Sequence, residues 1–136
     1  MKSNQKKIYI NYLDGVHVFI PVDAIELNNN EYEIQNNEDF DYEDNSILFE
    51  FGPGDIVKLK MINSNSGKIE IANELIKNGD KRNIGKRFLY YLSMDIPIEN
   101  HFTKEIINNL IKEIPFEDWI YPAARERLNK LRKQTS

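Results

Sequence analysis

Short runs of alternating apolar and polar residues, separated by turn residues, make up the first half of the chain. Period-two alternation is typical of strands that bury one face, and Asp-Gly at positions 14–15 is a strong hairpin signal. The strand-like runs are residues 8–13, 16–22, 32–34, 47–51, 55–62 and 68–71. Five or six short strands at this spacing predict a small antiparallel, barrel-like sheet of the SH3-like kind.

Residues 52–55, Gly-Pro-Gly-Asp, separate two of these runs. Proline fixes φ at one turn position, and glycine adopts positive φ without the steric cost of a Cβ atom. We therefore expect residues 47–51 and 55–62 to pair with each other on either side of this turn. The three asparagines at 28–30 predict another turn, because asparagine tolerates the left-handed region.

From residue 80 onward the apolar residues recur at helical spacing. The first apolar stripe is Ile84, Phe88, Tyr91 and Leu92. The expected boundaries are an N-cap at Asp80 for the first helix, an N-cap at Thr103 and a stop at Pro115 for the second, and Pro122 as the first residue of the third. Residues 72–80 fit a strand as well as a helical turn.

These patterns predict an α+β fold in a single domain, residues 1–136. The β-rich half comprises residues 1–71, and residues 72–136 are expected to form about three helices packed on the sheet. Each half is near the size at which a separate hydrophobic core is marginal, so we expect the halves to share one core.

The amino-acid composition excludes several kinds of functional site. The chain has no cysteine, which excludes disulfides, thiolate catalysis, zinc–cysteine sites and iron–sulfur clusters. It has no run of about 18 apolar residues, so no transmembrane helix is expected. The N-terminal residues lack the apolar segment of a secretory signal, which favours a cytoplasmic protein.

Charge is distributed unevenly along the chain. Residues 1–62 carry five lysines and twelve acidic residues, a net charge of −7, whereas residues 63–136 have a net charge of +3. Such an asymmetry can mark two faces with different partners. A solvated acidic loop and a solvated basic helix would give the same pattern.

The longest polar stretch, residues 35–46, is predicted to be an acidic loop. Acidic residues with interleaved aromatic ones suit a protein-binding surface, because aromatic side chains anchor interfaces. The candidate partner-binding residues are Asp39, Phe40, Asp41, Tyr42, Glu43 and Asp44. We expect at most one of the two rings to pack on the sheet. The alternative is a solvated connector, and the loop lacks the spacing of an EF-hand calcium site.

Catalytic signals are weak. His17 and His101 are the only histidines, and no catalytic or metal-binding motif surrounds them. We therefore predict a non-enzymatic protein with no catalytic residue, no cofactor and no metal. A small carboxylate-dependent enzyme is kept as an alternative, with Asp23, Glu50 and Asp55 as its candidate residues near the barrel mouth.

A second alternative is nucleic-acid binding through the basic C-terminal helices. Its candidate residues are Lys81, Arg82, Lys86 and Arg87. Phosphate contacts need a basic footprint, and the net charge of −4 for the whole chain opposes one.

Three motifs in residues 16–57 resemble those of small uncharacterised bacterial β-barrel domains. They are Ile-Pro-Val-Asp-Ala at 20–24, Tyr-Glu-Ile at 32–34, and Phe-Gly-Pro-Gly-Asp-Ile-Val at 51–57. The resemblance implies a compact β-barrel and carries over no catalytic residue.

The leading functional prediction is a protein-interaction module. Small acidic proteins of this size include immunity proteins, and many toxins are basic nucleases, so the acidic charge would speed their capture. The expected partner is another protein, with basic charge, and neither a nucleic acid nor a membrane.

Overall fold

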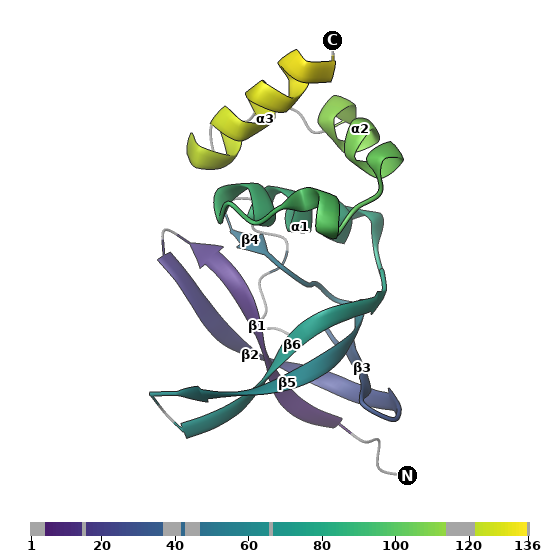
Figure 1. Ribbon diagram of the computed structural model, residues 1–136. Coiled ribbons are helices and arrows are strands. Elements are labelled where there is room, and N and C mark those ends of the chain that lie inside the picture. The colour runs from purple at the N-terminus through teal and green to yellow at the C-terminus, as the bar shows by residue number, and fades with distance from the viewer. Residues whose placement is uncertain are drawn as a thin grey trace.

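The computed structural model describes residues 5–14, 16–36, 42, 47–65, 67–113 and 122–135. Within these residues six strands form a curled mixed sheet, and the helices gather at one end of it (Figure 1). The predicted α+β class with a barrel-like sheet is confirmed. In chain order the elements are β1 (Gln5–Asp14), β2 (Val16–Asn28), β3 (Glu31–Ile34), β4 (Leu48–Phe49), β5 (Ile56–Ser64), β6 (Gly67–Lys77), α1 (Lys81–Ser93), the 3₁₀ helix η1 (Ile98–Asn100), α2 (Lys104–Glu113) and α3 (Pro122–Thr135).

The barrel closes through the strand order β1, β2, β3, β5, β6 and back to β1. The first four of these pairings are antiparallel. The last is parallel and consists of a single residue pair, Tyr9 with Ile71. The antiparallel sheet expected from the sequence is therefore interrupted at one seam, where β1 and β6 pair at one position only.

The expected pairing of residues 47–51 with 55–62 is wrong. β4 pairs instead with residues 12 and 13 of β1, and β5 pairs with β3 and β6. The intervening turn does use a glycine at positive φ, with φ of 89° at Gly54. The Gly54 amide donates to the carbonyl of Ile34 over 2.8 Å, so the turn docks on the end of β3. The next residues consequently continue along β3 and do not fold back on β4.

Residues 72–80, which fit either a strand or a helical turn by sequence, are mostly strand, because β6 continues to Lys77.

The helix starts lie where the sequence predicts them. The carboxylate of Asp80 then caps α1, and Oγ1 of Thr103 caps α2, by accepting first-turn backbone N–H groups at 2.8 and 3.2 Å. Pro122 is the first residue of α3. These three expectations are confirmed.

Helix α1 lies between the barrel and the other two helices (Figure 1). One hydrophobic cluster fills the barrel, and its fully buried members include Ile8, Ile10, Val22, Ala24 and Val57. A second cluster joins α1, α2 and α3, and its members include Phe88, Leu89, Leu110, Ala124 and Leu128. Both long sides of α1 are thus covered, and its residues from Lys86 to Leu92 are all buried.

The link between β6 and α1 passes close to the 52–55 turn. A Cβ atom added at Gly79 would lie 2.3 Å from the carbonyl carbon of Gly54, and that neighbour is backbone, which cannot move aside cheaply. We expect Gly79→Ala to lower the free energy of unfolding by about 1–3 kcal/mol, the usual cost of overpacking. Urea denaturation followed by circular dichroism measures the change.

Gly85→Ala is the matched control, because the space above Gly85 within α1 is open. Alanine is a better helix former than glycine, so this substitution should raise stability by up to about 1 kcal/mol. A loss of similar size for both substitutions would contradict the close approach at Gly79.

Candidate functional site

A buried polar cluster joins the barrel to α1, with the carboxylate of Asp55 at its centre. Asp55 is fully buried. Its two oxygens accept from the amides of Gly52 (2.9 Å) and Gly79 (2.7 Å) and from the side chains of Asn83 (2.9 Å) and Arg87 (3.0 Å). One carboxylate therefore holds together the 52–55 turn, the β6–α1 link and the first two turns of α1.

The guanidinium of Arg87 is the cation of this cluster, and its side chain is 3% exposed. Besides the Asp55 bond, Arg87 Nη1 donates to the carbonyl of Glu50 (3.1 Å), and Nη2 donates to Oδ1 of Asn78 (2.6 Å). A buried ion pair offsets its desolvation cost only when further hydrogen bonds satisfy both groups. That condition is met here, so the pair is a structural tie.

Lys86 makes a second connection between α1 and the rest of the chain. Its ammonium group donates to the carbonyls of Tyr42 (2.9 Å) and Ile47 (3.0 Å). It also lies 4.7 Å from the ring centre of Tyr42 and 5.2 Å from that of Phe49, within cation–π range. Lys86 thereby binds α1 to two points of the chain on either side of residues 43–46.

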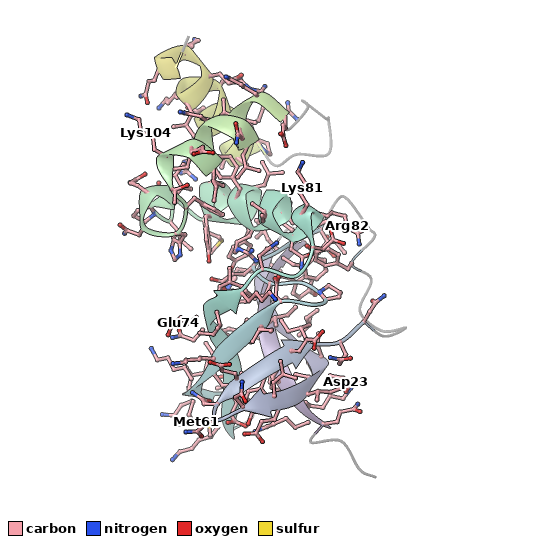
Figure 2. All side chains as sticks on the ribbon, turned by 90° about the vertical axis from the view of Figure 1, so that its right-hand side faces the viewer. Asp23, Met61, Glu74, Lys81, Arg82 and Lys104 are labelled. Carbon is pink, nitrogen blue, oxygen red and sulfur yellow. The ribbon has the colours of Figure 1, made fainter. Side chains whose placement is uncertain are left out.

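Two of the four basic residues considered for nucleic-acid binding do not lie on the surface, which corrects that assignment. Lys86 and Arg87 are buried, and only Lys81 and Arg82 are exposed at the start of α1 (Figure 2). Residues three and four apart share one face of a helix, so Asn83, Lys86 and Arg87 all point toward the barrel. The sequence gives a signal for this arrangement, because these polar residues follow helical spacing as regularly as the apolar ones do.

Tyr42 is the one candidate partner-binding residue of the acidic loop that lies within the described residues. Tyr42 is 3% exposed, and its ring packs 5.1 Å from that of Phe49. Burial raises the pKa of Tyr42 far above its usual value. Tyr42 is therefore part of the core and not a surface anchor, which corrects its assignment as a partner-binding residue. The other candidates, Asp39, Phe40, Asp41, Glu43 and Asp44, lie outside the described residues, and their role stays a prediction.

Glu50 belongs to a hydrogen-bonded chain that starts at the barrel surface. Asn11 Nδ2 donates to Oε1 of Glu50 (2.6 Å), and the hydroxyl of Tyr91 donates to Oε2 (2.9 Å). Asn11 Oδ1 is in turn 2.9 Å from Nε2 of His17. The ring of Tyr91 lies 4.2 Å from that of His101. The two histidines thus lie at opposite ends of one chain of contacts and do not form a joint catalytic site.

The carboxylates considered for catalysis differ in their surroundings. Asp55 is engaged by four donors, as described above. Asp23 pairs with Lys7 at 2.8 Å on the barrel surface. Burial raises the pKa of Glu50, and the hydrogen bonds from Asn11 and Tyr91 partly oppose that rise. Among the described residues no cluster of three or more His, Asp or Glu side chains could hold a metal ion.

A surface groove of about 340 Å³ lies between the β1–β2 hairpin and the tip of the β5–β6 hairpin. The two hairpins project from the same side of the barrel (Figure 1). The groove is lined by Tyr9, His17, Val18, Phe19, Ser64, Asn65 and Ile69. The same hairpins carry the two most exposed large apolar side chains in the described part of the chain, Val16 (66%) and Met61 (55%). Met61 lies at the barrel end remote from the helices (Figure 2).

Comparison with known proteins does not identify this chain: no family model matches it, and no curated protein or solved structure is significantly similar to it. None of the helices in the described ranges is both long and apolar enough to cross a membrane. Any functional assignment therefore rests on the geometry of the groove and of the polar cluster.

Loss of one charge should lower the free energy of unfolding more in the buried Asp55–Arg87 pair than in the Lys7–Asp23 pair at the surface. Asp55→Asn removes the anion that compensates Arg87, so we expect it to lower the free energy of unfolding by about 3–5 kcal/mol. Lys7→Gln breaks the exposed Lys7–Asp23 pair and should cost less than about 1 kcal/mol. Urea denaturation of both variants measures the contrast. A small effect of Asp55→Asn would show that the cluster is not the tie between barrel and helix.

The raised pKa of Glu50 predicts a pH dependence of stability. The folded state holds the Glu50 proton more tightly than the unfolded state does, so stability falls as pH rises from the usual pKa of 4.5 through the folded-state pKa. Glu50→Gln keeps the shape and removes the titration. The variant should therefore gain stability relative to the wild type as pH increases through this window, in urea denaturations at several pH values. A difference that does not change with pH would contradict the assignment.

Proposed function

We propose that the protein is a non-enzymatic interaction module that binds an extended segment of a basic partner protein in the groove between its hairpins. The observation that carries this proposal is the groove itself, with Tyr9, His17 and Phe19 on one wall and Ile69 on the other. Partly exposed aromatic side chains in a concave surface are the usual anchors of protein interfaces.

The backbone beside the groove favours an extended partner. β3 pairs with β2 only from Ala24 to Asn28, so the side of β2 away from β1 has no strand partner over Val16–Val22 among the described pairings. Three consecutive residues of this stretch, His17 to Phe19, line the groove. A segment that adds to a free strand edge gains main-chain hydrogen bonds, and side-chain pockets supply specificity. Pro21 has no N–H to donate, which limits such pairing to the first part of the edge.

Charge indicates the kind of partner. The first 62 residues have a net charge of −7, and Asp14 is exposed at the hairpin that borders the groove. An acidic surface attracts a basic partner over long range and accelerates association at low salt. Capture of a basic toxin by an immunity-type protein is the form of interaction that this charge supports.

The alternatives have less support. Two of the four cations considered for phosphate contacts are buried, which leaves Lys81 and Arg82 as a small footprint. The buried carboxylate Asp55 is fully engaged in holding the fold, and Glu50 is bonded to Asn11 and Tyr91. The groove between the hairpins is therefore better supported as a functional site than a catalytic site or a nucleic-acid site.

Selection from a displayed library of random peptides tests the groove directly. Each round is counter-selected against a Tyr9→Ala/Phe19→Ala double variant, and enriched peptides are measured by fluorescence anisotropy. We expect basic, extended peptides whose affinity falls about tenfold or more in the double variant, the scale of losing an aromatic anchor. Their association should slow with added salt.

Leu27→Ala is the matched control, because Leu27 is an exposed apolar residue (45%) at the other end of β2. It should leave peptide affinity unchanged, and circular dichroism should show all variants folded. Failure to enrich any groove-dependent peptide would overturn the proposal. Salt-dependent binding of a labelled oligonucleotide, lost in Lys81→Glu/Arg82→Glu, would favour the nucleic-acid alternative instead.

A further inference from the structure

A second cleft, also of about 340 Å³, lies where β6 meets α1 and η1. Glu74, on its lower wall, lies on the flank of the barrel beneath α1 (Figure 2). The cleft is separate from the hairpin groove and shares no lining residue with it. Its size is at the lower end of the range for small-molecule sites, so it suits a ligand of one ring.

The lining of this cleft is unusually polar. Asn73 and Glu74 come from β6, Asn100 and His101 from η1 and the residue after it, and Arg87 from the buried cluster. Small-molecule sites are mostly apolar with a few polar groups that fix orientation. In this cleft, side-chain amides and a carboxylate from β6 and η1 offer hydrogen-bond donors and acceptors on two sides. A ligand that fills the cleft must therefore have polar groups over most of its surface.

The remaining lining includes an apolar patch, and the Arg87 cation is paired within the protein. Phe51 and Leu75 contribute an apolar patch. Arg87 is paired with Asp55, and Glu74 lies opposite Lys58 in the β5–β6 ladder. Burial and the nearby Arg87 cation lower the pKa of His101, so its imidazole is neutral at pH 7. The cleft therefore offers no uncompensated cation to an anionic ligand.

We propose that this cleft binds a neutral, polyhydroxylated ring the size of a single sugar unit. The hydroxyl groups of such a ring supply both donors and acceptors to Asn73, Glu74 and Asn100, and its C–H face packs against the half-buried side chain of Leu75. A site built to bond hydroxyl groups discriminates strongly against ligands that lack them, because its own polar groups would otherwise be buried unpaired.

Saturation-transfer NMR on the full chain tests this site with named probes. The probes are glucose, galactose, mannose and N-acetylglucosamine, with adenosine as a flat heterocycle and methyl phosphate, whose methyl protons can report the transfer, as an anion. We expect transfer to at least one of the four sugars at millimolar concentration, and none to adenosine or methyl phosphate. Asn73→Ala should weaken sugar binding about tenfold, which corresponds to ~1.4 kcal/mol.

Asn63→Ala is the matched control, because Asn63 is also an exposed asparagine, on the neighbouring strand β5, and lies outside the cleft. It should bind sugar as the wild type does. The groove variant Tyr9→Ala/Phe19→Ala should also retain sugar binding, so this inference stands or falls separately from the interaction proposal. No transfer to any of these sugars, transfer to adenosine or methyl phosphate, or unchanged binding in Asn73→Ala would each overturn it.

Discussion

The fold depends on one buried carboxylate. Asp55 accepts hydrogen bonds from two backbone amides, one amide side chain and one guanidinium, and these donors come from the 52–55 turn, the β6–α1 link and α1. A buried carboxylate without donors would carry a large desolvation cost, and four donors satisfy this one. The position of α1 over the barrel is therefore set by polar chemistry, and hydrophobic packing completes it.

This constraint explains why α1 has charged residues on an inward face. Lys86 donates to the carbonyl groups of Tyr42 and Ile47, and Arg87 donates to the carbonyl group of Glu50 and to Asp55. Apolar contacts alone allow a helix to rotate or slide on a barrel end, whereas directional bonds permit one register. In this chain we regard specificity as the role of the buried charges, in line with one established use of such groups.

The sequence predicts the fold class and the starts of the helices well. It does not predict the buried polar cluster that joins the barrel to α1. Strand alternation, the caps at Asp80 and Thr103, and the start at Pro122 are local signals, and the structure confirms them. The partner of the 47–51 segment is not a local property, because it depends on the docking of the 52–55 turn on β3. The sequence offers Lys86 and Arg87 as candidates for phosphate contacts, because charged side chains usually face water. Their buried partners, the carbonyls of Tyr42 and Ile47 and the carboxylate of Asp55, lie far away along the chain.

The buried carboxylate Asp55 and the half-buried carboxylate Glu50 have different physical roles. Asp55 has a cation among its donors, whereas the side chain of Glu50 has only the neutral groups of Asn11 and Tyr91, and burial raises its pKa. Glu50 therefore keeps its proton to a higher pH than an ordinary glutamate does. It is also bonded through Asn11 to His17, which lines the hairpin groove. The amide of Asn11 therefore contacts the Glu50 carboxylate through its nitrogen and the groove residue His17 through its oxygen.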